Sequence, residues 1–380
     1  MIDWLNRQRE VAARYPGRMI GVGFRRWKAA NIRPMLGPDQ RQVVFVRDAG
    51  EAAAQAPQAR DCLVFWGREA PAGVAELARE SGAQLLRMED GFVRSVGLGS
   101  DFIRPLSLVL DESGIYFDPT QPSDLEKILA AGEFSAEELQ RARQVQAFIV
   151  EHGITKYNLE PREKAGWASG GREVVLVPGQ VEDDASIRFG CTDVKTNLGL
   201  LQAARRAHPQ AFIVYKPHPD VMSGNRAGSV AMAGALALAD HVEVHLSVIS
   251  CIEACDVVHT MTSLSGFDAL LRGKRVVVYG QPFYAGWGLT EDVLPESPAF
   301  LRRKFGVTVE ALIAGTLLRY PLYWDWDLKG YTSCEAVLEK IVKTRNAMEA
   351  SGGLQRLRAG YLRRQARKLG VLARAWLARW

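Results

Sequence analysis

Short apolar runs alternate with helical patterns along most of this chain, and no other feature limits its possible folds as strongly. In the first half, the apolar runs cover residues 19–22, 43–46, 62–65 and 84–88. Helical patterns or polar turns, such as 51–58 and 73–80, separate these runs. Because neighbouring parallel strands need a crossover connection, the pattern predicts a parallel sheet with crossover helices.

The second half of the chain repeats this alternation. Its apolar runs cover residues 174–177, 212–215, 242–244, 257–260 and 275–279. Helical patterns cover residues 193–207, 247–254 and 264–271. The predicted fold class is α/β, with two Rossmann-like domains facing a cleft and helices at the C-terminus. This outline describes the GT-B architecture of many nucleotide-sugar glycosyltransferases, although an analogy between folds does not by itself give a function.

Local patterns predict the boundaries and some connections. The expected domains are 1–165, 166–320 and a helical segment 321–380. The first boundary is placed there because residues 155–171 are polar and irregular. Two apolar runs flank Asp111-Glu112-Ser113-Gly114, which predicts a β-hairpin. A helix is expected after Ser135, because Ser135 and Glu138 form a capping-box pattern.

Composition excludes several classes of protein. The chain has 380 residues, enough for two domains. No apolar run approaches the ~18 residues of a membrane span, and the N-terminus lacks the apolar core of a signal peptide. The five cysteines are odd in number and lie mostly in apolar runs, which is typical of reduced cytoplasmic cysteines. The two Gly-x-Gly pairs lack the rest of the dinucleotide fingerprint, which argues against a nicotinamide enzyme.

The charge is concentrated near the C-terminus. Residues 354–380 include eight basic side chains and no acid, so the remainder is mildly acidic, which argues against nucleic acid as a partner. Apolar residues recur at helical spacing in the same segment, including Trp376 and Trp380. The segment is therefore predicted to lie on an anionic membrane surface. The alternative is that its apolar stripe packs on the N-terminal domain.

An acidic loop follows the first apolar run of the second half. Glu182, Asp183 and Asp184 come after Pro178-Gly179, and Ser186 follows them closely. In open α/β sheets ligands bind outside the carboxyl ends of the strands, where a carboxylate can be a nucleophile, a base or a metal ligand. The alternative is a solvated turn in which an Asp caps a helix.

Two further stretches follow predicted strands. Glu89-Asp90-Gly91 leads to Arg94 and Arg104, and the alternative to a functional role is a structural turn with salt bridges. Lys216-Pro217-His218-Pro219 holds an imidazole between two prolines that keep the backbone extended. A rigid histidine at a strand end suits a phosphate or a leaving oxygen, although a lone histidine is more often structural.

The fourth stretch lies between a predicted strand and a helix. It runs from Thr260 to Asp268 and contains Thr262, Ser263 and Ser265. Free amides at a helix N-terminus and neighbouring hydroxyls bind anions, and the same serines can serve as ordinary N-caps. The loop 280–290 follows, and its glycines and aromatic residues suit close backbone approach and stacking on a sugar or base.

Together these strings resemble the bacterial capsule polysaccharide β-Kdo transferases of the KpsC type. The resemblance rests on EDGFVRSVGLGSD, RPLSLVLDESGIYFD, VPGQVEDDASI, KPHPD, TSLSGFDALLRGK and YGQPFYAGWGLT, which occur in this order between residues 21 and 290. Typical members have two transferase modules in tandem, whereas this chain has one copy of each motif, so it is expected to be a single module or a standalone relative.

The resemblance implies a chemistry and a set of roles. A GT-B enzyme would transfer Kdo from CMP-Kdo, with retention of configuration, to a Kdo-terminated lipid-linked acceptor in capsule linker synthesis, and it would need no metal. Asp184, or second Asp183, would be the nucleophile, and Glu89 or Asp90 would be the general base. The residues expected to bind substrate are Arg94, Gln180, Ser186, Lys216, His218, Thr262, Ser263, Ser265, Gln281 and Trp287. The enzyme is expected at the inner face of the bacterial inner membrane, bound peripherally through its basic tail.

Two other functions stay open at this point. A sialyltransferase-like enzyme could use another CMP-nonulosonate with the same phosphate-binding motifs. A non-catalytic scaffold for capsule assembly could keep the fold, but it would not need the loop acids and His218, and all of these are present.

Overall fold

The computed structural model describes residues 2–37, 42–160, 162–222, 226–303, 305–358 and 368–372. The chain forms two compact units, each made of segments that are distant in sequence. The first unit comprises Met1–Ile115, Ile154–Leu159 and Thr316–Trp380, and the second comprises Tyr116–Gly153 and Glu160–Gly315. Within the described residues, no helix is both long enough and apolar enough to cross a bilayer.

The first unit is built on a mixed sheet. Its strands are β1 (Met19–Val22), β2 (Val43–Val46), β3 (Cys62–Trp66), β4 (Gln84–Asp90), β5 (Ser107–Asp111), β12 (Pro321–Asp325) and β13 (Gly330–Thr332). They lie in the order β13-β12-β5-β4-β3-β1-β2. Strands β2, β1, β3 and β4 are parallel, and β5, β12 and β13 add antiparallel pairs at one side. The carboxyl ends of β1, β3 and β4 therefore lie at one edge of the sheet.

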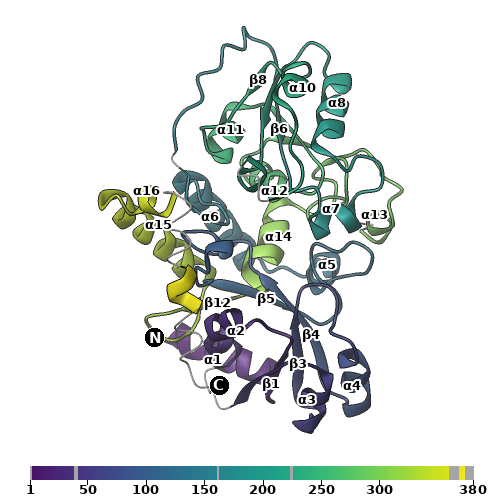
Figure 1. The fold of residues 1–380 in the computed structure, drawn as a ribbon, viewed down its shortest axis with the longest axis vertical. Helices are drawn as coiled ribbons and strands as arrows, with labels where there is room; N and C mark the ends of the chain where they lie inside the picture. The colour runs from purple at the N-terminus through teal and green to yellow at the C-terminus, as the bar shows by residue number, and fades with distance from the viewer. Residues whose placement is uncertain are drawn as a thin grey trace. The chain divides into compact units, whose positions relative to one another are not determined.

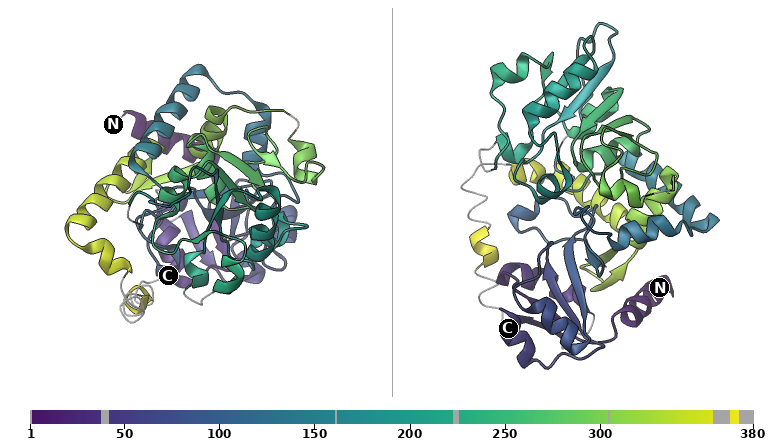
Figure 2. Two further views of the ribbon diagram at one scale, coloured as in Figure 1. Left: turned by 90° about the horizontal axis from the view of Figure 1, so that it is seen from above. Right: turned by 90° about the vertical axis from the view of Figure 1, so that its right-hand side faces the viewer.

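Helices cover both faces of this sheet. They are α1 (Ile2–Arg14), α2 (Arg26–Ile32), α3 (Ala49–Ala54), α4 (Val74–Ser81), α15 (Cys334–Ala350) and α16 (Gly353–Arg358), with short 3-10 turns η1 (Arg33–Leu36) and η3 (Gly99–Asp101). One face packs Ile32 of α2 and Met35 of η1, and the other packs Ala52 of α3 and Val74 of α4. Alternate residues of each strand supply the two cores, as the period of a strand requires. Figure 2 shows the unit from two further directions.

The second unit contains a fully parallel sheet. Its strands are β6 (Val174–Pro178), β7 (Phe212–Lys216), β8 (His241–Val242), β9 (Val257–Thr260), β10 (Arg275–Val278) and β11 (Glu291–Asp292). Their order is β11-β10-β9-β6-β7-β8, and each recorded pair is parallel. All five residues of β6 are buried, which explains why its run is uniformly apolar rather than alternating.

Helices complete the second unit. They are α5 (Asp124–Ala131), α6 (Ala136–His152), α7 (Ala185–Gly190), α8 (Asn197–Ala207), α9 (Pro219–Met222), α10 (Met232–Leu236), α11 (Val248–Ala254), α12 (Leu264–Leu270), α13 (Pro298–Arg302) and α14 (Val309–Ile313). A π-helical segment, η4 (Ala314–Arg319), follows α14. Figure 1 shows α8 and α11 on opposite sides of β6, and both contact it. The predicted α/β class with two parallel-rich halves is confirmed, as is the capping box of Ser135 and Glu138.

The hairpin prediction is wrong. Residues 115–117 form no strand, and β5 pairs with β4 and with the late strand β12. Asp111 ends β5, because its carboxylate accepts the N–H groups of Ser113 (3.0 Å) and Gly114 (2.8 Å). The hydroxyl of Tyr320 donates to the same carboxylate at 2.7 Å. The four-residue sequence is therefore an Asx turn that closes the strand.

The units also divide the chain differently from the expected domains. Strands β12 and β13 lie within the segment 321–380, where only helices were expected, and β12 completes the first sheet by pairing with β5. Helices α5 and α6, expected in the first domain, belong to the second unit. There the side chain of Gln146 on α6 donates to the carbonyl of Leu271 at 2.9 Å.

Candidate active site

The acidic loop after β6 presents an exposed carboxylate at the start of α7. Asp184 is the N-cap of this helix, and its Oδ1 accepts the Ser186 N–H at 3.0 Å and the Ser186 hydroxyl at 2.8 Å. Its Oδ2 forms no hydrogen bond with the described residues, and the side chain is exposed. The capping alternative is therefore correct for one oxygen, while the other oxygen stays available to a ligand.

A chain of hydrogen bonds connects Asp184 to the neighbouring strand β9. The Thr262 hydroxyl donates to the Ser186 hydroxyl at 3.1 Å, and the Gln180 amide donates to Thr262 at 3.1 Å. The side-chain oxygen Oε1 of Gln180 accepts the N–H groups of Met261 and Thr262, both at 3.1 Å. Gln180 is buried, so these bonds are made away from water and hold the two strand ends in register. We therefore assign Gln180, Thr262 and Ser186 to one network that orients Asp184.

The other two acids of the loop have different partners. The Glu182 carboxylate accepts the Asn197 N–H at 2.7 Å, at the start of α8. Asp183 forms an ion pair with Arg226 at 3.1 Å, and both side chains are exposed. The three adjacent carboxylates thus have three different partners. Asp184 is joined to the side chain of Gln180 through Ser186 and Thr262, whereas Glu182 is joined to the Gln180 backbone through Asn197.

The lysine that ends β7 and the histidine that follows the strand are both held in place. Lys216 is buried, and its ammonium donates to the carbonyl of Leu246. The Nδ1 atom of His218 accepts the Asp220 N–H at 3.1 Å, so a neutral ring must have its proton on Nε2. Burial lowers the pKa of His218, although the carboxylates of Asp220 and Asp184 oppose this effect. The neutral ring can therefore offer a single N–H donor near Asp184.

Two serines at the start of α12 form a cap: Ser263 is the N-cap, and Ser265 lies in the first turn of the helix. The Ser263 hydroxyl accepts the Ser265 N–H and donates to the Ser265 hydroxyl, each at 3.1 Å. The Tyr284 hydroxyl donates to the Ser263 carbonyl at 2.6 Å. A Cβ at Gly266 would lie 2.2 Å from that tyrosine hydroxyl, so only glycine allows the contact. The capping role is observed, and a phosphate-binding role for these serines stays a prediction.

The loop 280–290 does not present its predicted side chains to a ligand. Trp287 is 1% exposed, and its indole N–H donates to the Phe283 carbonyl at 2.9 Å. The prediction that Trp287 stacks on substrate is therefore corrected: the ring is part of the core. Gln281 is also buried, and its side-chain oxygen accepts the Ala299 N–H at 3.2 Å. Gln281 thus anchors the loop.

In the first unit, β4 ends in the carboxylate pair Glu89 and Asp90. Asp90 Oδ2 lies 2.7 Å from Nε of the buried Arg94, while its buried Oδ1 has no hydrogen-bond partner among the described residues. Burial and the Asp90 charge raise the pKa of Glu89 to about 7, and Lys156 and Lys28 partly offset this rise. A carboxyl group with this pKa can both accept and release a proton near neutrality.

The turn after this pair has a steric reason for its glycine. A Cβ at Gly91 would lie 2.2 Å from the Ser107 hydroxyl oxygen, which donates to the Val93 carbonyl. Arg104, which follows the acids in sequence, lies over the ring of Trp326, 4.8 Å from its centroid. The sequence did not indicate Lys28 as a residue of this site, because Lys28 lies on α2, which follows β1, whereas the acid pair ends β4.

A family model for capsule polysaccharide biosynthesis proteins matches residues 61–169 and 160–323. The chain belongs to this family. The capsule polysaccharide modification protein LipA of Neisseria meningitidis serogroup B is 40% identical over 356 residues, which are 94% of this chain and 50% of LipA. The lipopolysaccharide-processing protein LpsZ of Rhizobium meliloti is 34% identical over 348 residues, which are 90% of this chain and 73% of LpsZ. This chain therefore spans about half the length of LipA.

Two solved structures are similar in fold and sequence. The β-Kdo 2,7 transferase of Thermosulfurimonas dismutans KpsC matches with a TM-score of 0.69 and 33% identity, over 86% of this chain and 99% of that one. The β-Kdo 2,4 transferase of the same KpsC matches with a TM-score of 0.72 and 30% identity, over 86% and 98%. The resemblance seen in the motifs is confirmed. The match covers nearly the whole of each solved transferase chain.

Proposed function

We propose that this chain is a retaining β-Kdo glycosyltransferase of GT-B architecture that transfers Kdo from CMP-Kdo to a Kdo-terminated, lipid-linked acceptor in capsule linker synthesis. The observation that supports this most strongly is the match to two β-Kdo transferase chains of KpsC along nearly their whole length. The exposed oxygen of Asp184 and the acid pair of β4 supply groups suited to this chemistry.

In the proposed first step Asp184 is the nucleophile. Its Oδ2 forms a bond to the anomeric carbon of Kdo as the bond from that carbon to the CMP phosphate oxygen breaks, and CMP leaves with the electron pair. Ser186 holds Oδ1 through two hydrogen bonds, which fixes the direction of the free oxygen. The product is a covalent glycosyl ester, and a second displacement then restores the original configuration.

The departing phosphate needs donors, and the second unit has suitable ones. The Nε2 proton of His218 is free of the bond that holds the ring, and the hydroxyls of Ser263 and Ser265 lie at the end of β9. Preorganised donors of this kind stabilise charge that develops on a leaving group. The proposal includes no metal, and we expect transfer to continue in excess chelator.

In the proposed second step, Glu89 accepts the proton of the acceptor hydroxyl while that oxygen forms a bond to the anomeric carbon of Kdo. The bond from that carbon to Asp184 Oδ2 breaks, its electron pair stays with the oxygen, and Asp184 returns as a carboxylate. A pKa raised to about 7 by burial and by Asp90 suits this role, since the group is ionised for part of its population and basic enough to take the proton. Arg94 Nε lies 2.7 Å from Asp90 Oδ2, and this ion pair holds the Asp90 carboxylate in place beside Glu89.

The function is tested by incubation with CMP-Kdo and synthetic Kdo-terminated glycolipids, followed by NMR of the product. A new β-linked Kdo is the expected result. A panel of other CMP-nonulosonates in the same assay identifies the donor. Turnover only with another CMP-sugar would replace the Kdo assignment, and no turnover with any donor would contradict the enzyme proposal.

The membrane proposal concerns the basic tail. The predicted helix 354–380 lies mostly outside the described residues, which include only 354–358 and 368–372 of it. In the described part, Lys368 lies 3.9 Å from an oxygen of Asp101 and 5.8 Å from the centroid of the Phe102 ring. We propose peripheral binding to the inner face of the bacterial inner membrane through the remaining basic residues.

Sedimentation with anionic liposomes tests this proposal. A chain ended after residue 358 keeps Leu354, which is buried, and removes the remainder of the tail. We expect it to lose binding to the liposomes and to retain activity on a short soluble acceptor. Equal sedimentation of the full and shortened chains would contradict the proposal.

A further inference from the structure

A lysine lies at the edge where three parallel strands of the first unit end. Strands β1, β3 and β4 are parallel neighbours, so their carboxyl ends share one edge of the sheet. Trp66 ends β3, and Glu89 and Asp90 end β4. Lys28 lies in the first turn of α2, the helix that follows β1. The topology therefore brings Lys28, an indole and two carboxylates to the edge where α/β sheets bind ligands.

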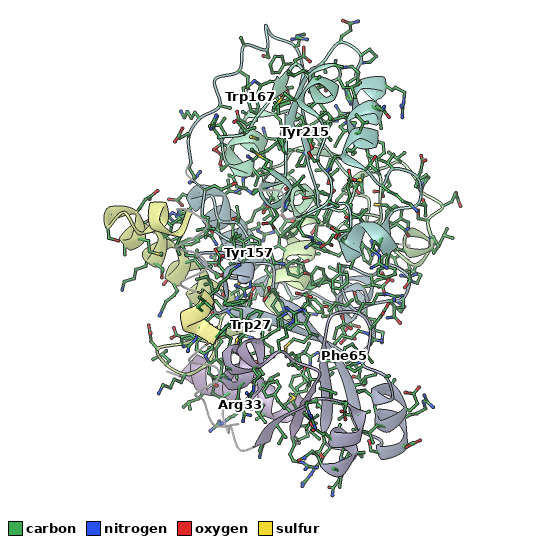
Figure 3. The ribbon with its side chains drawn as sticks, in the orientation of Figure 1. Trp27, Arg33, Phe65, Tyr157, Trp167 and Tyr215 are labelled. Carbon is green, nitrogen blue, oxygen red and sulfur yellow. The ribbon has the colours of Figure 1, made fainter. Side chains whose placement is uncertain are left out.

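Lys28 is held by aromatic rings and not by an anion. Its ammonium lies 3.2 Å from the centroid of the Trp66 ring and 5.8 Å from that of Trp27, which Figure 3 labels. Phe24 packs edge-on against Trp66, with ring centroids 6.4 Å apart. The ammonium forms no hydrogen bond or ion pair with any described residue. Stacking on the indole fixes the position of the charge and leaves its N–H donors free.

The charges around Lys28 are partly balanced. Glu89 and Asp90 favour its charged form, whereas Arg94, Arg25 and above all burial disfavour it, and the pKa of Lys28 is lowered as a result. Asp90 is paired with Arg94 at 2.7 Å. The half-buried ammonium thus lacks both full hydration and a direct partner, which is unfavourable until an anion binds.

We propose that Lys28 binds the carboxylate of the acidic sugar that ends the acceptor. This inference rests on the proposed function, in which the acceptor hydroxyl approaches Glu89. An acidic sugar oriented in that way brings a third negative charge beside Glu89 and Asp90. An added cation must offset this charge, and Lys28 is the cation near the pair whose ammonium has no bonded partner among the described residues.

A phosphate on the lipid part of the acceptor could bind the same ammonium, because lysine acts as a point charge. The experiment therefore uses probes without phosphate: a methyl glycoside of Kdo and its carboxamide, titrated without CMP-Kdo and followed by NMR. Wild type should bind the carboxylate more tightly than the carboxamide by roughly 10- to 100-fold, the range for a hydrogen bond to a charged group.

Lys28→Met and Lys28→Gln should both lose this preference, while Lys28→Arg should keep part of it. The matched control is Lys343→Met, since Lys343 is an exposed lysine on α15 of the same unit. Affinity for CMP should not change in any variant, which separates a local effect from unfolding. The inference is overturned if wild type binds both probes equally, or if the neutral variants still prefer the carboxylate.

A different result would overturn the proposed function. A wild-type enzyme that prefers the carboxylate probe but transfers no Kdo would overturn the reaction and keep the Lys28 site. Transfer of Kdo by a wild-type enzyme that shows no carboxylate preference would keep the proposed reaction and overturn the Lys28 site.

Discussion

Both units place carboxylates near the carboxyl end of a parallel strand, at the end of β4 in one and in the loop after β6 in the other, but the surroundings of these carboxylates differ. In the first unit, Glu89 and Asp90 are half-buried, and Arg94 and Lys28 lie close by. In the second unit, Asp184 is exposed and accepts two hydrogen bonds from Ser186. The first site raises the pKa of a carboxyl group, and the second fixes the orientation of one.

This difference suits the two sites to the two chemical roles that we propose for them. A general base works best with a pKa near the working pH, which burial and a like charge provide for Glu89. A nucleophile must instead reach the substrate with a free oxygen in a fixed direction, which the cap of α7 provides for Asp184. Assigning acid–base and nucleophilic roles from such contrasts is a general approach to sites with two carboxylates.

The largest expected effect comes from Asp184→Asn. Asparagine caps a helix as well as aspartate does, so α7 should be kept while the nucleophile is lost. We expect transfer to fall by about 10³-fold or more, with little change in Tm or in CMP affinity. Intact-protein mass spectrometry of the wild type with donor should detect a Kdo adduct on the loop.

The matched control for this variant is Asp183→Asn. Asp183 is also exposed but pairs with Arg226, so its loss should change transfer only slightly. If Asp183→Asn is the inactive variant and Asp184→Asn turns over normally, the nucleophile is Asp183. The contrast between the carboxylates of the two units would then apply to Asp183 and not to Asp184.

The next effect concerns Glu89. The base must be ionised, so kcat/KM of the wild type should fall about tenfold for each unit of pH below about 7. Glu89→Gln should lower kcat by roughly 10²- to 10⁴-fold and remove this acidic limb. A mutant profile with the same limb would assign the titration to another group.

Glu89 should also affect stability, with the opposite dependence on pH. Its raised pKa means that the fold favours the protonated form. Its contribution to stability is therefore fully present below the unfolded pKa of about 4.3 and is lost as the pH rises through about 7. Glu89→Gln should melt above wild type at pH 8 and close to it at pH 4, as differential scanning calorimetry can measure.

A smaller effect is expected at His218, whose two ring nitrogens can be tested separately. Asparagine places an acceptor near the position of Nδ1 and can keep the bond from the Asp220 N–H, but it lacks the Nε2 donor. Glutamine can keep a donor near Nε2. We expect His218→Asn to bind CMP about tenfold more weakly by calorimetry, and His218→Gln to bind it with an intermediate affinity. Unchanged CMP affinity in both variants would place the phosphate site elsewhere.

Much of the fold could be predicted because its cause is local. Buried parallel strands such as β6 are continuous apolar runs, and the Ser135 capping box depends on residues three apart. The candidate acids could be found because they directly follow such strands. One oxygen of Asp184 caps α7, as the capping alternative predicts, and the role of the other oxygen as a nucleophile stays a prediction.

The features that could not be predicted depend on contacts between distant segments. The four residues after Leu110 suit an Asx turn as well as a hairpin, and the pairing of β5 with β12 decides between them. The composition around Trp287 suits burial as well as stacking. Lys28 meets Trp66 only because β1 and β3 are neighbours, which no local pattern encodes.

The smallest effect tests the reverse case of Glu89, a buried carboxylate with a lowered pKa. Glu243 follows β8 and accepts the N–H groups of His245 (2.8 Å) and Leu246 (2.9 Å), and the indole N–H of Trp167 (3.1 Å). Burial alone would raise the pKa of Glu243, but these bonds favour the charged form and lower it to about 2. Hydrogen bonding therefore decides the sign here, whereas burial decides it at Glu89.

A lowered pKa gives Glu243 a contribution to stability that is present above its unfolded pKa of about 4.3 and is lost as the pH falls through about 2. Glu243→Gln removes the charge and turns an N–H group toward existing donors, so we expect it to lower the free energy of unfolding at pH 7 by about 1–3 kcal/mol. The difference from wild type should shrink between pH 4.3 and pH 2 in urea titrations, since the wild type then loses the same charge. The Lys216 ammonium donates to the Leu246 carbonyl, so the loop after Glu243 also holds Lys216. We therefore expect transfer to decrease only as far as this loop shifts Lys216. A stability difference that stays constant from pH 7 to pH 2 would show that the charge of Glu243 is not what stabilises the loop, and the contrast with Glu89 would then rest on packing alone.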